Sequence, residues 1–356
     1  MSPSTSARAR ASLRVLTATA VAVLLAGGCK SASESDGGGG GGKGDGKAFT
    51  LVTPDPVAQN EFLKLAVDGV RSAAKEHGGR TPKVFQSRDT NSRLQNVQSA
   101  VDAGPDVIAL VGFEFADIVA QQAEAHPKQQ FLLVDACTKK AYANVTCAVF
   151  REHEAVYLAG AEAGLLTKSD KVGAVDVLDT SQFRRYSEPF AAGAKKVNPK
   201  VRAETLYVGG QSPFNDPARA KEQAATLGSS RTDQVMAAAA GGNTGIFQAA
   251  KAAAFQAYGV DANQCPGSGG VVVDNVLKKT DVALEKGVAQ ILGGKGGTTV
   301  SYGLKEGGMS LTGLEPGLAD SQCLIAKAGN ADVLKRVQAL REDIVAGKLK
   351  VDDPAA

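Results

Sequence analysis

The sequence lacks the cysteine and histidine spacings of a metal site. It has no C-x-x-C pair, and its three histidines, His77, His126 and His153, lie in predicted helices or at their ends without ligand spacing. We expect each of them to be a solvated helix residue, and we expect no metal and no cofactor. The basic residues are dispersed and the net charge is only +3, so nothing indicates a nucleic-acid partner.

Signatures of common enzyme classes are missing as well. No G-x-S-x-G occurs, and GGKGG at 293–297 lacks the hydroxyl residue and the glycine spacing of a phosphate loop. Glu152-His153-Glu154 could form an acid–base unit, but it fits the opening of a helix better, where carboxylates favour the positive end of the dipole. Because no nucleophile, base and orienting group fall together, we expect no enzyme.

One apolar run, residues 15–27, follows three arginines and ends just before Cys29. A membrane-spanning helix needs about 20 apolar residues, so this run is too short, and no later run is long enough. The pattern predicts a secretory signal peptide over residues 1–28. Ala26-Gly27-Gly28 before the cysteine resembles a bacterial lipobox, which implies acylation of Cys29. A secretory signal with a chance cysteine is the alternative.

A polar, glycine-rich segment follows the cysteine. Residues 30–47 cannot bury enough apolar surface to fold. As a flexible coil this segment has an r.m.s. reach of roughly 20–25 Å. We therefore expect residues 29–47 to be an acylated cysteine followed by a tether that holds a globular domain just off a membrane surface.

Roughly 310 residues follow the tether, enough for two domains or lobes. The strand candidates are 48–52, 83–86, 106–111, 130–134, 145–149, 171–175, 203–208, 234–240 and 270–274. The helical candidates between them are 62–78, 92–104, 115–127, 152–168, 218–228 and 246–258. Near-continuous apolar strands alternating with helices predict an α/β fold with two parallel sheets, each covered by helices on both faces.

Four cysteines lie in the folded part. In an exported domain this even number permits two disulfides with three possible pairings, and free buried cysteines are the alternative. Cys137 and Cys147 lie at or near the ends of successive predicted strands, so they can approach each other. We expect the pairs Cys137–Cys147 and Cys265–Cys323.

Ligands of open α/β sheets sit beyond the carboxyl ends of the strands. The residues that follow the predicted strands are Thr53-Pro54-Asp55, Phe113, Asp135, 208–216, 241–245, Asp261 and Asp274-Asn275. Carboxylates accept hydroxyl hydrogen bonds, aromatic rings offer stacking faces, and glycines let backbone N–H groups approach. This set suits a polar, ring-bearing small molecule. In 214–221, Asp216 and Pro217 predict a helix start, and Phe214 either enters a cleft or packs on its own helix.

Four stretches together resemble one family of bacterial lipoproteins. They are 106–135, with its strand, GF turn and terminal Asp; 144–175, with F-x-x-HE-x-x-x-LAG; 214–224, with FNDP; and 259–264 with 276–281, carrying GVDANQ and VLKKTD. These segments resemble the basic membrane protein family, which includes purine nucleoside receptors. The resemblance runs from about Lys83 to Leu314.

The resemblance implies a type I periplasmic-binding-protein fold, in which three hinge crossings join two Rossmann-like lobes around a ligand. The implied boundaries are 48–149 plus about 270–298 for the first lobe and 150–269 plus about 299–356 for the second. The implied ligand contacts are Asp55, Phe62, Asp135, Phe214, Gly242, Asp261 and Lys278. Phe62 and Phe214 would stack on a base, Asp261 would hold a ribose, and Lys278 would lie on a helix.

The implied function is that of a monomeric, lipid-anchored solute receptor on the extracytoplasmic face of the cell membrane, which delivers a nucleoside, preferably a purine nucleoside, to an ABC permease. A sugar or modified nucleoside as ligand, or a surface sensor without transport, are the alternatives. The chain departs from the family pattern at two positions. Leu63 stands where Asn is usual, and Asn263 replaces an Asp that we expect at the base edge.

Overall fold

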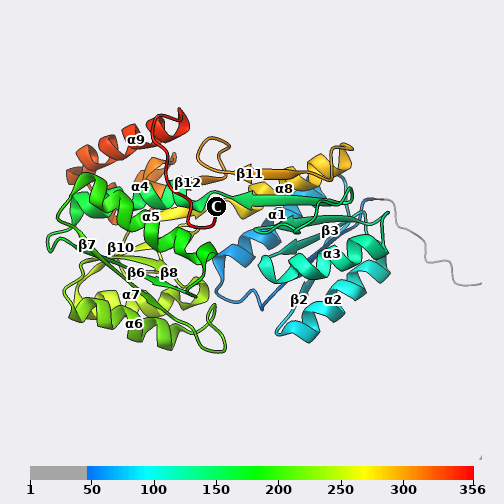
Figure 1. Ribbon diagram of the computed structural model, residues 1–356, viewed down its shortest axis with the longest axis horizontal. Coiled ribbons are helices and arrows are strands. Elements are labelled where there is room, and N and C mark those ends of the chain that lie inside the picture. The colour runs from blue at the N-terminus through cyan, green and yellow to red at the C-terminus, as the bar shows by residue number, and fades with distance from the viewer. Residues whose placement is uncertain (1–45) are drawn as a thin grey trace, which may run out of the picture. The chain divides into compact units, whose positions relative to one another are not determined.

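The computed structural model describes residues 46–356 (Figure 1). The expected signal peptide, Cys29 and nearly all of the glycine-rich segment lie outside the described residues. None of the helices formed by residues 46–356 is both long and apolar enough to span a bilayer.

The first of two sheets contains six parallel strands in the order β11-β5-β4-β3-β1-β2. Its strands are β1 (Phe49–Thr53), β2 (Lys83–Gln86), β3 (Val107–Val111), β4 (Gln130–Val134), β5 (Val145–Phe150) and β11 (Thr299–Tyr302). Its helices are α1 (Glu61–Glu76), α2 (Thr90–Ala103), α3 (Ala116–Ala125) and α8 (Thr280–Leu292). Both faces are covered, because Leu51 joins the buried cluster of α1 and α8 while its neighbour Val52 joins that of α2 and α3.

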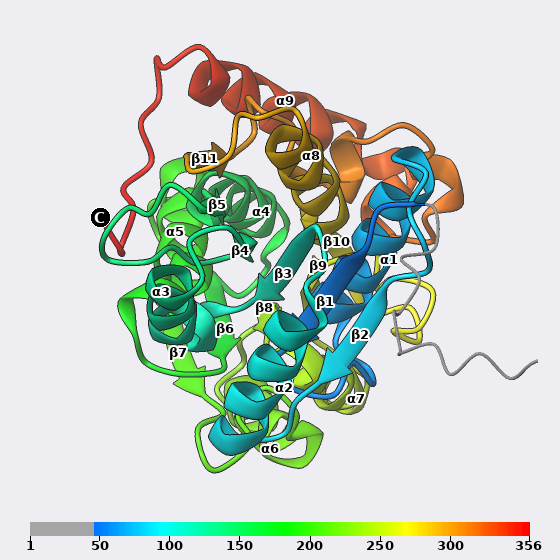
Figure 2. The same ribbon diagram turned by 90° about the vertical axis from the view of Figure 1, so that its right-hand side faces the viewer.

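The second sheet has the order β12-β10-β9-β8-β6-β7 and is parallel except for β12, which runs antiparallel to β10. Its strands are β6 (Lys171–Asp176), β7 (Arg202–Tyr207), β8 (Gln234–Ala238), β9 (Gln256–Asp261), β10 (Val272–Lys278) and β12 (Met309–Leu311). Its helices are α4 (Glu152–Leu166), α5 (Ser181–Val197), α6 (Pro217–Ser229), α7 (Asn243–Ala253) and α9 (Ala331–Val345). Figure 2 shows β1, β2 and α2 of the first sheet toward the viewer.

We call each sheet with its helices a lobe. Within residues 46–356 the chain passes between the lobes three times, after β5, after β10 and after β11, as the expected fold requires. The expected boundaries need correction at two places. β10 pairs with β9 and β12, so residues 272–278 belong to the second lobe. β11 pairs with β5, so residues 299–302 belong to the first.

Two elements differ from the sequence-based expectation for local reasons. The apolar stretch 246–258 is not one helix, because Ala254 adopts a left-handed φ of 57° that ends α7 and lets β9 begin. A non-glycine residue gives no sequence signal for such a break. The sequence does not predict helix α5, since this segment is polar and contains Pro189. In addition, Asp274 and Asn275 lie inside β10 rather than after it.

Helices α4 and α5 approach each other at backbone distance. A Cβ atom at Gly160 would collide with the carbonyl oxygen of Phe190, and one at Gly193 would collide with that of Tyr157. Only glycine permits this approach. Helix α4 is buried on all sides along most of its length, which fixes its N-terminus close to the crossings between the lobes.

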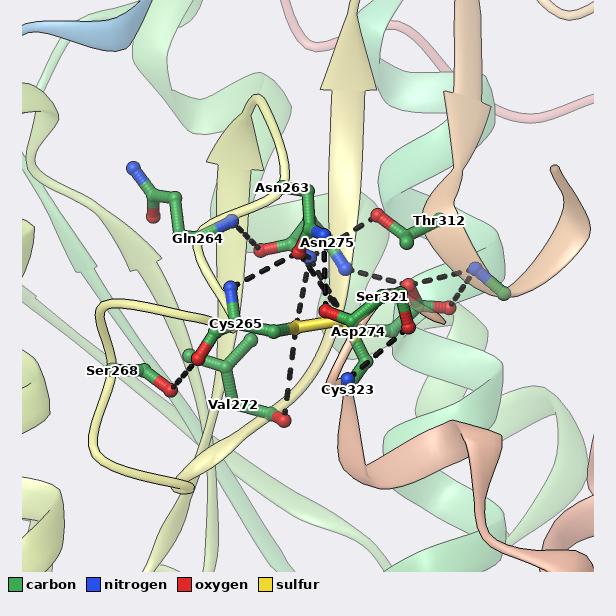
Figure 3. The surroundings of a disulfide bond; sticks show 11 residues. Asn263, Gln264, Cys265, Ser268, Val272, Asp274, Asn275, Thr312, Ser321 and Cys323 are labelled. Atoms are coloured by element: carbon green, nitrogen blue, oxygen red, sulfur yellow. Dashed lines mark hydrogen bonds between the residues drawn. A yellow bond between two sulfur atoms is a disulfide. The ribbon is translucent and has the colours of Figure 1, made fainter. Parts of the chain in front are cut away.

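Both expected disulfides are confirmed, Cys137–Cys147 and Cys265–Cys323. Figure 3 shows the second one beside Asn275, whose amide nitrogen donates to the Asn263 side-chain oxygen at 3.2 Å. The Asn263 amide in turn donates to the Ser321 carbonyl at 3.0 Å. Asn263 therefore supports the loop around this disulfide, and it is not among the residues that line the cavity described below.

Candidate functional site: a cavity between the lobes

A cavity with a volume of about 90 Å³ lies between the two sheets, at the carboxyl ends of their parallel strands. One water needs roughly 10–15 Å³, so the cavity has room for several waters. Its polar and aromatic lining includes Asp55, Phe62, Phe113, Glu114 and Asp135 from the first lobe and Phe183, Tyr186, Phe214, Asp261 and Lys278 from the second. A molecule filling this space therefore contacts both lobes.

The cavity brings together most of the residues expected from the sequence. Those that line it are Asp55, Phe62, Asp135, Phe214, Asp261 and Lys278. Gly242 is not among the lining residues. It lies in a 3-10 turn (Ala240–Gly242), where a Cβ atom would be 3.2 Å from the Cβ atoms of Ala220 and Ala239. The structure therefore places Ala240, not Gly242, at the cavity wall.

Three lining residues have strained backbones. Asp135, Ala240 and Asp261 follow or end β4, β8 and β9, and their φ angles are 67°, 51° and 71°. Non-glycine residues in this left-handed region cost on the order of 1–3 kcal/mol each, and such residues gather at functional sites. The turns aim Asp135 and Asp261 into the cavity, which their residue types alone would not predict.

Aromatic rings from both lobes meet beside the cavity. The Phe113 ring of the first lobe lies 6.0 Å from that of Phe183 and 6.3 Å from that of Phe214, and Phe183 and Phe214 are 5.5 Å apart. These geometries are edge-on or tilted, as aromatic contacts prefer. Phe62 instead faces Lys278, whose Nζ lies 5.0 Å from its ring centroid. Stacking of a ligand between Phe62 and Phe214 stays a prediction.

Lys278 carries the central positive charge of the cavity. It is the last residue of β10, so the expectation of a helical position is wrong. Its Nζ donates to Asp135 Oδ1 at 2.6 Å and to Glu152 Oε1 at 2.8 Å. Although burial lowers the pKa of Lys278, these carboxylates outweigh it and hold that pKa well above its usual value. The ammonium therefore remains charged, and these two carboxylates accept two of its three N–H groups.

Two further lining carboxyls titrate near neutral pH. Burial raises the pKa of Asp261 to about 7 against the opposing effect of Lys278, with Asp135 adding to the rise. Burial likewise raises the pKa of Glu114 to about 7, although Arg93 lowers it. Such groups accept hydrogen bonds when ionised and donate when protonated, so both states are available to a polar ligand.

Asp55 and Arg93 form a pair at the cavity rim. Arg93 Nη2 lies 3.4 Å from Asp55 Oδ1, and Arg93 Nε donates to the Pro54 carbonyl at 3.0 Å. Burial raises the pKa of Asp55 more than Arg93 lowers it. The nearby Asn60 caps α1 by accepting from Leu63 N, and both Asn60 and Leu63 line the cavity. An Asn side chain is therefore present at this end, three residues before the position where the family pattern has it.

The helix opening predicted at Glu152-His153-Glu154 is confirmed, because α4 begins at Glu152. The expectation of a solvated His153 is wrong. His153 is 6% exposed, and its Nδ1 lies 3.7 Å from Asp353 Oδ2 in the C-terminal segment that covers it. Burial lowers its pKa, so His153 is neutral at neutral pH. Over residues 46–356, His, Cys, Asp and Glu side chains nowhere gather in threes as a metal site would need.

Comparisons with known proteins agree with this geometry. A family described as "ABC transporter substrate-binding protein PnrA-like" matches residues 47–340. The chain is 30% identical to "ABC transporter nucleoside-binding protein BmpA" of Lactococcus lactis over 86% of this chain and 88% of that one. It is 27% identical to "Basic membrane protein A" of Borreliella burgdorferi over 72% and 77%.

A solved solute-binding protein from Aeropyrum pernix superposes with a TM-score of 0.76, at 24% identity, over 87% of this chain and 94% of that chain. This likeness concerns the fold, and it confirms the type I solute-binding architecture expected from the sequence. The match to the family model extends over most of the chain, both lobes included. The chain is therefore a member of the PnrA-like family of ABC transporter substrate-binding proteins.

Proposed function

We propose that this protein binds a nucleoside, preferably a purine nucleoside, in the cavity between its lobes. The observation that carries the proposal is a single cavity lined by aromatic rings from both lobes together with Asp135, Asp261 and Lys278. Rings offer stacking faces to a base, while carboxylates and an ammonium suit ribose hydroxyls. The nucleoside-binding name of the Lactococcus relative supports the same ligand class.

In this proposal the base stacks against Phe62 and Phe214, and Asp261 accepts hydrogen bonds from ribose hydroxyls. Lys278 donates its remaining N–H group, and Asp55 and Glu114 meet the base edge from the first lobe. Residues of both lobes line the cavity, so the lobes would separate to admit the ligand. Since the ligand touches both lobes only in the closed state, binding shifts a hinge equilibrium toward closure.

We further propose that Cys29 is acylated and that residues 30–47 tether the folded part to the extracytoplasmic face of the cell membrane. From there the closed, monomeric receptor would dock on an ABC permease. The lipobox-like sequence before Cys29 supports this placement. Palmitate labelling of the full chain, lost in Cys29→Ser, is the expected result; equal labelling of both proteins would contradict it.

A thermal-shift screen of nucleosides, free bases and sugars tests the ligand class. A ligand present at 100 times its Kd adds about 2.7 kcal/mol to the free energy of unfolding. We expect purine nucleosides to give the largest shifts. Stabilisation by sugars alone would contradict the proposal and favour another solute.

Asp261→Ala tests the site itself. Losing buried hydroxyl contacts costs about 2–4 kcal/mol of binding free energy, measured by calorimetry with the best nucleoside of the screen. Asp352→Ala, a change of the same kind at an exposed position, should leave the Kd unchanged. An unchanged Kd in Asp261→Ala would remove this residue from the site.

A further inference from the structure

The segment after α9 returns to the region between the lobes. From α9 it runs toward α5 and the start of α4 (Figures 1 and 2). Val351 is only 8% exposed, whereas its neighbour Asp352 is exposed. The next residue, Asp353, turns toward α5. A stretch remote in sequence from the cavity is thus fixed close to it.

Asp353 accepts two parallel hydrogen bonds from the guanidinium of Arg185 in α5, and we call this pair of bonds the fork. Arg185 Nε donates to Asp353 Oδ1 and Nη2 donates to Oδ2, both at 2.7 Å. Burial raises the pKa of Asp353, but the hydrogen bonds from Arg185 outweigh burial and bring it below its usual value. Paired bonds of this kind fix the plane of a guanidinium. The orientation of Arg185 therefore depends on Asp353.

The fixed guanidinium directs its remaining nitrogen at Glu152. Arg185 Nη1 lies 3.3 Å from Glu152 Oε2 and 3.5 Å from the Phe150 carbonyl oxygen. The other carboxylate oxygen of Glu152 accepts from Lys278 at 2.8 Å. The Glu152 side chain is 3% exposed and that of Lys278 is 5% exposed. One buried carboxylate is thus shared between Arg185 and the cationic side chain of the cavity.

We propose that Asp353 is a positioning residue for the ligand cavity, acting through Arg185 and Glu152 on the Lys278 ammonium. This inference rests on the proposed role of Lys278 in ligand binding. Without Asp353 the guanidinium loses two bonds and turns onto Glu152, where it competes with Lys278 for the same carboxylate. Lys278 is then held by Asp135 alone, and its free N–H group no longer points at one fixed place. Asp353 touches no ligand in this scheme.

A different role for the segment would be to cover α4 and α5 without influencing the cavity. Two neighbours of Asp353 separate these roles. Val351→Ala loosens the same segment but leaves the fork intact. Asp352→Asn removes the same charge from an exposed position one residue away. If the segment only covers the helices, Val351→Ala and Asp353→Asn should affect stability and nothing at the cavity.

The binding test uses calorimetry on the full chain with guanosine and adenosine, each titrated separately. Asp353→Asn should weaken binding about 5–20-fold, Asp353→Glu should recover part of the loss, and both controls should stay within twofold of wild type. In an Arg185→Met background, Asp353→Asn should weaken binding less than twofold further, because Asp353 acts on Lys278 through Arg185, which this background lacks. An equal loss from Val351→Ala, or a full extra loss in that background, would overturn the proposal.

A measurement without ligand separates failure of this proposal from failure of nucleoside binding. In the unliganded protein, acetylation of Lys278 by acetic anhydride is followed by mass spectrometry, with exposed Lys348 as the internal standard. We expect Asp353→Asn to raise the relative rate at Lys278 at least threefold and Val351→Ala to leave it unchanged. If neither nucleoside binds the wild type, the ligand class is wrong and this rate alone decides the role of Asp353. An unchanged rate would refute it.

Discussion

Replacing Lys278 with methionine removes the cation that holds two buried carboxylates in the cavity. Glu152 keeps Arg185 as a partner, but Lys278 is the cation bound to Asp135, at 2.6 Å. Breaking a buried ion pair on one side costs about 3–5 kcal/mol, because the remaining charge is left without compensation. Asp135 is therefore the group whose protonation should respond.

The size of the effect follows from the pKa of Asp135. Burial raises this pKa to about 6 even with Lys278 opposing it. Without Lys278 this pKa should rise further, and each unit of that rise corresponds to about 1.36 kcal/mol. At pH 8 the folded variant must therefore either bury an unpaired carboxylate or take up a proton, which costs about 3 kcal/mol, the lower end of the range for a broken buried ion pair. At pH 5 Asp135 is protonated in both folded proteins, so the difference in unfolding free energy between the wild type and the variant nearly disappears.

Urea unfolding followed by circular dichroism at pH 8 and pH 5 measures this difference. Lys279→Met is the matched control, because Lys279 is the next residue and its pair with Glu315 at 3.0 Å is partly exposed. Exposed pairs contribute about 0–1 kcal/mol, so the control should lose little at either pH. A loss below 1 kcal/mol for Lys278→Met at pH 8, or equal losses at both pH values, would refute the reasoning.

The remaining predictions concern the aromatic contacts between the lobes, the buried carboxyl of Asp176 and the Cys265–Cys323 disulfide. Phe113→Ala removes two aromatic contacts between the lobes, each worth about 0.5–1.5 kcal/mol, and should weaken nucleoside binding about tenfold by calorimetry; an unchanged Kd would exclude this role. Burial raises the pKa of Asp176 to about 8, so folding favours its protonated form and its destabilising effect grows as pH rises from 4 to 8. Asp176→Asn should therefore raise the unfolding free energy by up to about 4 kcal/mol at pH 7 and by little at pH 4, and equal gains at both would contradict this account. Replacing Cys265 and Cys323 with serine opens a 58-residue loop and should cost about 4 kcal/mol in urea unfolding, whereas a loss below 1 kcal/mol would mean that the unfolded chain is already compact.

Residues that follow strands could be predicted from the sequence because a local pattern marks them. Asp135 ends an apolar run, and in a parallel sheet that position necessarily faces the ligand edge. Asp261 stands both among the residues expected at strand ends and in the family motif, although the sequence places the start of its strand β9 in a helix. Both lie in the cavity.

The sequence does not predict Phe183 as a site residue, because it gives no strong signal for helix α5. Helix α5 has polar residues at many positions and contains Pro189, and its stability comes from packing against α4 through Gly160 and Gly193 rather than from propensity. A signal existed in Thr180-Ser181 before an amphipathic stretch, but it was too weak to outweigh the proline. The sequence places the crossings between the lobes incorrectly for a similar reason, since an edge strand such as β11 is identified only by its partner β5.

The sequence by itself determined the α/β alternation, the strand-end position of Asp135 and the family, because each is encoded in local patterning or in short motifs. It permitted three disulfide pairings, and the structure decided between them. Only the tertiary structure decided how the charges combine. Arg185 and Asp353 are 168 residues apart in sequence, and no local preference links them to each other or to Lys278. Their contact exists because folding brings α5, the start of α4, the end of β10 and the C-terminal segment to one place, where buried charges must find partners.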